Sequence, residues 1–228
     1  MDRFRAKEID LATWNLTLSA LIKYDKSFLV DLQNIQDKVL KNISDSKIIT
    51  SKYIYRCPSE TFHFSMVNFA SMKGPSRQDF EFMLRNKKKE IVKAVRKDQE
   101  TFRKWSFTDP RLYPSSGENG NSIALNLSIK ELKDKNEAVG ALKNIFSLAD
   151  LDIETKLPAV VINLVRFFGE PNKEEKKIMS HNIDNLNKLL RSRNSTWLSE
   201  FHLKKLSLVI SNMYLTNRKT EIKLFNLS

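Results

Sequence analysis

The stretch FHFSMV at residues 62–67 alternates in the manner of a β-strand, with His63 and Ser65 on one face and phenylalanines on the other. A second stretch, VVINLVRF at residues 160–167, is apolar and rich in β-branched residues, which indicates another strand. An imidazole and a hydroxyl side by side on a strand can hold a phosphate oxygen and transfer a proton. The two stretches therefore decide the expected fold and the expected site.

Together these stretches resemble the paired motifs of the 2H phosphoesterase superfamily, the RNA 2′,5′-ligase-like and cyclic phosphodiesterase proteins, in which each motif reads His-x-Thr/Ser. The first motif is present as His63 and Ser65. In the second, Val161 stands in the histidine position and Asn163 in the threonine position, whereas the arginine that commonly follows is kept as Arg166. The order of the elements between the motifs also fits, so the resemblance covers nearly the whole chain.

The resemblance implies an α+β, bilobal 2H phosphoesterase-like fold, in which two sheet-and-helix lobes with pseudo-two-fold symmetry surround a central cleft. Residues 1–228 are expected to form a single bilobal domain with approximate lobes 1–100 and 101–228, and C-terminal strands are allowed to cross between the lobes. One motif strand from each lobe would line the cleft.

The resemblance also implies a division of labour, with one histidine as general base and the other as general acid. Both groups must titrate near neutrality. Valine cannot bind or release a proton, and asparagine cannot replace an imidazole. His63 and Ser65 are therefore the candidate catalytic residues, and Val161 and Asn163 are their degenerate partners.

A second candidate for the lost motif is Lys205-Leu206-Ser207, with lysine in the histidine position. A lysine with an ordinary pKa near ~10.4 is a poor proton shuttle, although it can neutralise a phosphate. The candidate phosphate- or nucleic-acid-binding residues are Arg166 and Lys205, with Tyr53 and Tyr55 beside the first motif as stacking platforms for bases. Weaker candidates for stacking are Trp105, Phe107 and Tyr113.

The charge of the chain favours a polyanionic partner, RNA or nucleotide phosphates before a membrane. The 228 residues include 39 basic and 27 acidic side chains, for a net charge of +12. The same surplus is also typical of a solvated basic surface. The basic run at residues 85–89, continued by Lys93, Arg96 and Lys97, is either a solvated helix face or a stripe that binds a nucleic-acid backbone.

The cysteine and histidine content argues against disulfides and metals. Cys57 is the single cysteine, so no disulfide can form within the chain, and a reducing cytoplasm fits best. The three histidines lack zinc-ligand spacing, and we expect metal-independent chemistry with no cofactor. No stretch approaches the ~20 apolar residues of a membrane span, and the first ten residues lack the apolar core of a secretion signal.

Periodicity predicts strands interleaved with helices and without strict β-α-β alternation, which favours an α+β fold. A helix is expected to begin near Asp25, and an irregular loop is expected from Asp109 to Asn121. The predicted strands are 14–22, 52–56, 61–69, 102–107, 123–129, 160–167, 201–211 and 221–227, and the further helices are a long basic one around 80–95, 133–151 and 173–193.

Two classes of function follow from these patterns. The first is a catalytically silent 2H-like protein. Such a protein either binds RNA ends or nucleotide phosphates, or uses the central cleft between its lobes as a protein-interaction module. The second is an active phosphodiesterase on 2′,3′-cyclic or 2′,5′-linked substrates that uses His63 with a non-histidine partner. Loss of both polar residues of the second motif favours the silent protein, since one general acid or base contributes only ~10²–10⁴-fold.

Overall fold

The computed structural model describes residues 14–46, 54–70, 77–115, 121–129, 140, 160–167, 172–192, 198, 201–203, 205–212 and 218–226. The protein is α+β, with two antiparallel sheets. The four-stranded sheet has the order β3 (His63–Ala70), β1 (Trp14–Leu21), β8 (Lys205–Asn212), β9 (Arg218–Asn226). The five-stranded sheet has the order β2 (Ile54–Arg56), β6 (Val160–Phe167), β5 (Asn121–Ile129), β4 (Ser106–Ser115), β7 (Phe201–His202).

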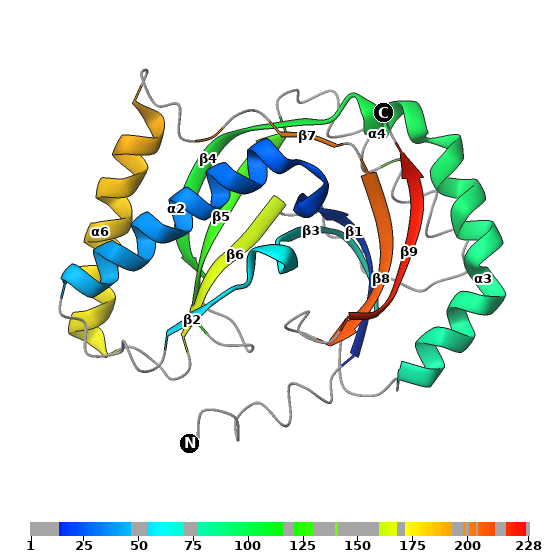
Figure 1. Ribbon diagram of the computed structural model, residues 1–228, viewed down its shortest axis with the longest axis horizontal. Helices are drawn as coiled ribbons and strands as arrows, with labels where there is room; N and C mark the ends of the chain where they lie inside the picture. The colour runs from blue at the N-terminus through cyan, green and yellow to red at the C-terminus, as the bar shows by residue number, and fades with distance from the viewer. Residues whose placement is uncertain are drawn as a thin grey trace.

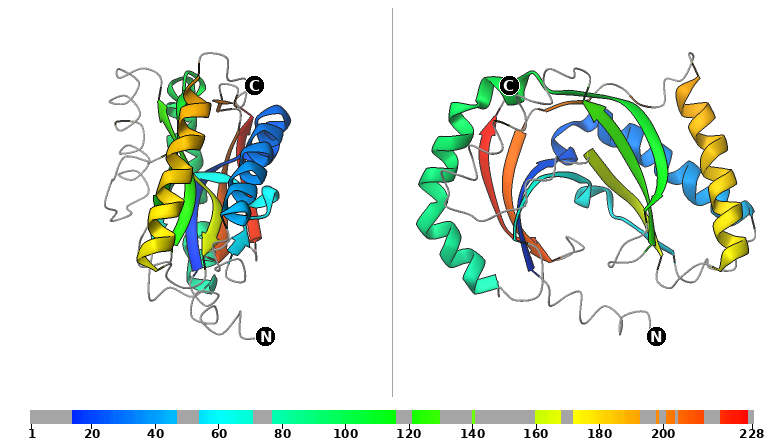
Figure 2. Two further views of the ribbon diagram at one scale, coloured as in Figure 1. Left: turned by 90° about the vertical axis from the view of Figure 1, so that its left-hand side faces the viewer. Right: turned by 180° about the vertical axis from the view of Figure 1, so that it is seen from behind.

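The sheets curve toward each other to form an arch, with helices on its outer sides (Figures 1 and 2). α3 (Arg77–Lys97) lies outside the four-stranded sheet and α6 (Lys173–Arg191) outside the five-stranded one, while α2 (Lys26–Asp45) crosses in front of β5 and β6 in Figure 1. The shorter helices are η1 (Ile22–Tyr24), η3 (Ser59–Thr61) and α4 (Gln99–Arg103). Because β8 and β9 pair beside β1, and β2 joins the other sheet, neither sheet is built from one half of the sequence.

One hydrophobic core joins the helices to both sheets. The helical spacing expected after Asp25 is confirmed: the Asp25 carboxylate accepts a hydrogen bond from the Phe28 amide at 3.2 Å and caps α2, and the five apolar residues of its stripe, Phe28, Leu32, Ile35, Val39 and Ile43, are buried. Phe64, on β3, stacks 5.3 Å from Phe107 and lies 5.0 Å from Phe201, both in the other sheet. The apolar face of each sheet is thereby committed to the core, which leaves the opposite faces for a site.

A buried glutamine fastens α2 to the five-stranded sheet. Gln36 is fully buried, and its Nε2 donates hydrogen bonds to the carbonyl oxygens of Cys57 at 2.8 Å and Leu164 at 2.7 Å. Its Oε1 accepts a hydrogen bond from Nε of Arg56 at 3.0 Å. The Cys57 oxygen has no other donor among the described residues, whereas the Leu164 oxygen also accepts a hydrogen bond from the Cys57 amide at 3.1 Å.

Gln36→Leu is expected to destabilise the protein by about 1–3 kcal/mol, because the buried Cys57 carbonyl oxygen loses its donor while the side-chain volume is kept. Urea unfolding measures this, and an unchanged slope of the transition would show that the fold itself is retained. Asn34→Leu, at an exposed position of the same helix, is the matched control and is expected to change the stability by less than about 0.5 kcal/mol. Equal effects of the two variants would contradict this role of Gln36.

The structure corrects three expectations about the segments that form β4, β7 and β8. The loop expected from Asp109 to Asn121 is wrong for residues 109–115, which belong to β4, while residues 116–120 lie outside the described part of the chain. A register shift between Thr108 and Arg111, with Asp109 at φ 53°, forms a bulge. The bulge accommodates Pro110, whose presence favoured a loop in the sequence. Phe102, expected in a strand, belongs to α4. The expected strand 201–211 is divided, since β7 pairs with β4 and β8 pairs with β1.

Most other expected elements are confirmed, whereas the helix expected at 133–151 lies outside the described residues except for Gly140. α6 begins at a capping box in which the Asn172 side chain accepts the amides of Glu174 and Glu175. Asn187 of α6 is buried and pairs with the backbone of Leu112 through two hydrogen bonds of 2.7 and 2.8 Å, which holds α6 against β4. No helix within the described ranges is long and apolar enough to cross a membrane.

Candidate functional site

His63 stands at the start of β3, where the local backbone fixes its ring. The turn η3 precedes it, and the Ile22 amide donates to the Phe62 carbonyl at 3.0 Å, which ties the end of β1 to the residue before the histidine. Nδ1 of His63 lies 2.8 Å from the Thr61 carbonyl oxygen. Since a carbonyl only accepts hydrogen bonds, Nδ1 carries a proton, and Nε2 is the nitrogen that can gain or lose one.

A line of hydroxyl groups crosses the sheet on the same face as His63. Ser19 of β1 lies opposite Ser65 of β3 and opposite Ser207 of β8. Ser19 and Ser207 are buried, and the Ser19 Oγ is 2.8 Å from the Thr17 Oγ1. The Ser65 side chain lies outside the described part of the structure, so only its place in the strand is established. These positions alternate with core residues such as Leu18 and Ala20, as period-2 strands require.

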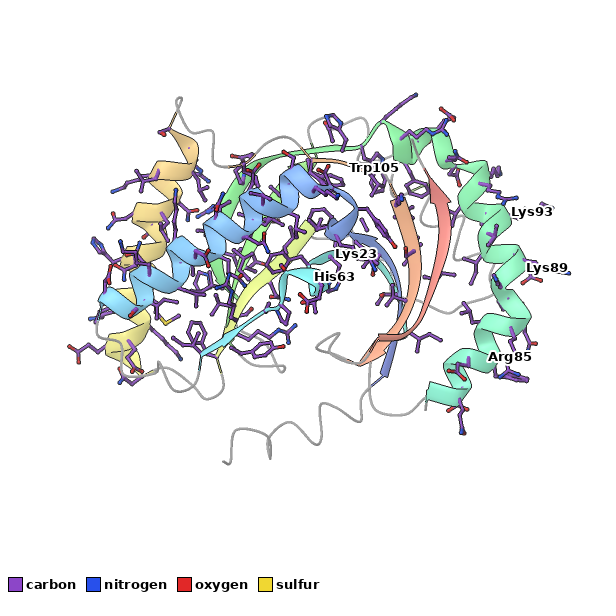
Figure 3. The ribbon with its side chains drawn as sticks, viewed as in Figure 1. Lys23, His63, Arg85, Lys89, Lys93 and Trp105 are labelled. Carbon is purple, nitrogen blue, oxygen red and sulfur yellow. The ribbon has the colours of Figure 1, made fainter. Side chains whose placement is uncertain are left out.

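Two lysines converge on one tyrosine ring beside this line. The Nζ of Lys205 lies 4.5 Å from the centre of the Tyr24 ring, and the Nζ of Lys23 lies 5.1 Å from the same centre. The Tyr24 ring packs on Leu21 and Val209, which share the face of Ser19 and Ser207. Lys23 follows Ile22 and His63 follows Phe62, the two residues joined by a backbone hydrogen bond, and Figure 3 shows both side chains in the middle of the molecule. The result is a concentration of positive charge near an imidazole.

The five-stranded sheet presents a second polar face. Val161 and Asn163 are half-buried and alternate with the fully buried Ile162. Leu164 is the extra residue of a bulge, because Asn163 pairs with Ala124 and Val165 with the adjacent Ile123. The bulge changes the alternation, so that Arg166 lies opposite Ser122 and on the same face as Asn163.

Asn163 is held by Ser122, whose Oγ donates to the Asn163 Oδ1 at 3.1 Å. β2 pairs only with the last three residues of β6, and β3 contacts β6. In Figures 1 and 2 the faces of the two sheets that turn away from α3 and α6 look toward each other across the arch. His63 and Val161 therefore lie on neighbouring strands of different sheets, whereas Lys205 lies in the same sheet as His63.

Tyr55, Cys57 and Arg166 form a connected group at the end of β6. Tyr55 pairs directly with Arg166. Burial raises the pKa of the Tyr55 hydroxyl, and the nearby Cys57 raises it further, against the opposing effect of the Arg166 guanidinium. Burial also raises the pKa of the Cys57 thiol to about 11, although Arg166 forms a hydrogen bond with it and opposes the rise. The thiol is therefore neutral at physiological pH and suited to packing.

The Cys57 thiol is expected to resist a thiol-reactive reagent at pH 8 in the folded protein and to react at once in denaturant, because only the exposed thiolate is nucleophilic. The raised pKa also means that the folded state binds the thiol proton more tightly than the unfolded state, so this contribution to stability is present below the unfolded pKa near 9 and is lost as pH rises toward about 11. Rapid labelling of the native protein at pH 8 would contradict the buried position.

The structure sorts the residues predicted from the sequence into four sets. His63, Lys205 and Ser207 share one face of the four-stranded sheet, and Val161, Asn163, Arg166 and Tyr55 belong to the five-stranded sheet. Tyr53 lies outside the described residues. Trp105 and Phe107 are fully buried in the aromatic core, so their expected role as stacking platforms for bases is wrong.

The sequence reasoning missed Lys23 and Tyr24 as site residues. Polar residues alternating along the first strand, Thr17 and Ser19 among them, were a signal for a second polar surface, but nothing in the sequence joins that strand to Lys205. The other histidines do not contribute: His181 lies on α6 within 3.1 Å of Asn185, and His202 is exposed on β7. The described residues contain no group of three or more His, Cys, Asp or Glu side chains that could hold a metal ion.

No family model matches the sequence, and no curated protein matches it significantly. Among solved structures, Usb1 of Kluyveromyces marxianus with uridine monophosphate is similar with a TM-score of 0.49 and 14% identity, over 95% of this chain and 99% of that chain. A second structure of Kluyveromyces marxianus Usb1 gives a TM-score of 0.44 and 16% identity over the same shares of the two chains. Similarity at this level assigns no function to the chain.

Proposed function

We propose that this protein is a single bilobal domain of the 2H phosphoesterase type that binds the phosphate of an RNA end or a nucleotide between its two polar sheet faces, with little or no catalysis. His63, Lys23 and Lys205 form the anion-binding centre in this proposal. The hydroxyl of Ser65 would bind a phosphate oxygen from the same strand as His63. Arg166 and Tyr55 would contact the ligand from the five-stranded sheet.

The convergence of Lys23 and Lys205 on the Tyr24 ring, on the face that carries His63, is the observation that supports this proposal most directly. Two ammonium groups beside one ring attract an anion such as a phosphate. Ammonium groups and an imidazolium form short, charge-assisted hydrogen bonds with phosphate oxygens. An ordinary apolar or neutral ligand would gain nothing from this arrangement.

Weak or absent catalysis follows from the proton-active groups available. His181 lies on α6, and His202, which shares the polar face of the five-stranded sheet opposite Ser106, stands on the edge strand β7, separated from β6 by β5 and β4. Val161, in the position of the second histidine, cannot exchange a proton. Lys23 and Lys205 can stabilise negative charge on a bound phosphate through charge-assisted hydrogen bonds.

The test compares two short RNAs of about four nucleotides that differ only in a terminal 3′-phosphate or 3′-hydroxyl. We expect the phosphorylated RNA to bind at least about tenfold more tightly, since one charge-assisted hydrogen bond contributes ~1.5–3 kcal/mol. His63→Gln should reduce this preference, and His181→Gln, at an exposed position of α6, should leave it intact. Equal affinity of the two RNAs, or no binding at low salt, would overturn the proposal and favour a protein-interaction module.

A further inference from the structure

The outer surface of α3 carries a straight row of cations on the side of the four-stranded sheet opposite His63. Arg85, Lys89 and Lys93 are exposed at intervals of four residues, or about 6 Å along the helix axis. Figure 3 shows these three side chains pointing away from both sheets. The opposite side of the helix is fixed in the core through Leu84, Ile91, Ala94 and Val95, so the row cannot turn inward.

The charge of this helix is strongly unbalanced. α3 contains eight basic and three acidic residues, which gives a net charge of +5. Lys87 forms an ion pair with Glu90 at 3.4 Å, and Asp79 and Glu81 have other partners. Within the described part of the chain, no ion pair involves Arg85, Lys88, Lys89, Lys93, Arg96 or Lys97. Arg85, Lys89 and Lys93, the exposed cations of the row, are therefore not neutralised by ion pairs within the described part of the chain.

Two further features distinguish this surface from an ordinary solvated helix face. Phe82, three residues before Arg85, is 67% exposed, the largest exposed fraction among the exposed large apolar residues of the described chain. A hollow of about 490 Å³ adjoins the row, lined among the described residues by Lys88, Lys89, Val92, Lys93 and Arg96. Its volume falls within the range of small-ligand pockets, and its described lining combines the apolar side chain of Val92 with four cations.

We propose that this surface, named the α3 track and formed by Phe82, Arg85, Lys88, Lys89, Lys93 and Arg96, binds the body of a single-stranded RNA. Cations in a row match successive phosphates, and an exposed aromatic ring provides a face on which a base stacks. A lipid surface fits less well, because the apolar side of the helix is buried in the core and cannot enter a bilayer. The choice of RNA as the strand rests on the proposed function, whereas the preference for a single-stranded polyanion rests on the α3 track itself.

The central experiment measures binding of an RNA of about 20 nucleotides with a 3′-hydroxyl end at several salt concentrations. The triple variant Arg85→Gln/Lys89→Gln/Lys93→Gln is expected to lower affinity by about 10²-fold near 0.1 M salt and to reduce the salt slope by about 2, since each single-strand phosphate contact contributes about 0.7 to that slope. The matched control, Lys173→Gln/Lys177→Gln/Lys188→Gln on α6, removes the same charge from exposed positions on the other side of the molecule. Its affinity should fall by less than about threefold.

Stacking is tested separately. Phe82→Ala is expected to weaken binding of the same RNA by about tenfold. Leu189→Ala, which removes an apolar side chain that is 51% exposed on α6, should have no effect. All these positions are exposed and helical, and protection of the Cys57 thiol confirms that each variant is folded.

Several outcomes would overturn the α3 track. Equal losses in the two triple variants would mean that net charge alone binds RNA. Binding to phosphatidylserine vesicles that exceeds RNA binding and is lost in the α3 variant would identify a lipid surface instead. The triple variant should keep the preference for a short 3′-phosphorylated RNA. A lost preference for the terminal phosphate therefore reports on the proposed phosphate site, and a lost affinity for the long strand reports on the α3 track.

Discussion

The double variant Val161→His/Asn163→Thr is expected to hydrolyse a 2′,3′-cyclic phosphate or a 2′,5′-linked oligonucleotide about 10²–10⁴-fold faster than the natural chain, the contribution of one well-placed proton-transfer group. Val161 and Asn163 lie on one face of β6, and the strand that begins with His63 contacts β6. A second imidazole there would provide the acid or base that the present residues cannot. Single-turnover hydrolysis at neutral pH measures the gain.

Adding His63→Ala to the double variant should abolish the gain, because both groups are needed at once. Val161 is half-buried, so a polar ring at this position should cost about 1–3 kcal/mol at most, and thermal unfolding checks that the variant is folded. A folded double variant without any gain on these substrates would mean that β3 and β6 do not contact the same bound phosphodiester. Activity of the natural chain that His63→Ala removes would show instead that another residue already acts as the partner.

Removing both lysines that face Tyr24 is expected to have the next largest effect. Lys23→Gln/Lys205→Gln should weaken binding of a short 3′-phosphorylated RNA by about 10²-fold, because two charge-assisted contacts of ~1.5 kcal/mol each are lost. Binding of the same RNA with a 3′-hydroxyl should change much less. Titration calorimetry measures both affinities.

The matched control for the lysine pair is Lys26→Gln/Lys41→Gln, which removes two exposed charges from α2 and leaves the face of His63 unchanged. This control should alter the affinity for either RNA by less than about threefold. If the control variant lost as much affinity as the Lys23/Lys205 variant, long-range electrostatic attraction would explain the binding. The position of the two lysines beside Tyr24 would then not contribute specifically to it.

Much of the fold could be predicted because local patterns dominate it. The spacing of apolar residues after Asp25 and the alternation around His63 reflect elements whose buried faces follow directly from period 3.6 or period 2. Composition was misleading where a bulge absorbs a proline: Asp109 and Pro110 look like loop residues, but the chain returns to register at Arg111. A bulge changed the interpretation of β6 as well, since strict alternation would place Asn163 and Arg166 on opposite faces.

The site was only partly predictable because its residues meet through long-range pairing. His63 and Lys205 were chosen from the sequence for separate reasons, and only the sheet order, with β1 between β3 and β8, brings them to one surface. Lys23 and Tyr24 belong to no recognisable motif. They join the site because the short helix η1 places them beside Lys205. Buried residues such as Trp105 were equally hidden, because an aromatic residue near a predicted loop does not reveal whether it faces solvent or core.

The position of β1 between β3 and β8 has a consequence for how the chain acquires its site during synthesis. Leu16 of β1 pairs with Ile210 of β8. The edge of β1 that faces β8 therefore stays uncovered until residue 210 has been synthesised. Until then a nascent chain has His63 but neither Lys205 nor Ser207, and β1 presents an open edge to other chains. Folding dominated by such distant contacts is slow. The phosphate-binding surface should therefore appear only late, in one step with closure of the four-stranded sheet.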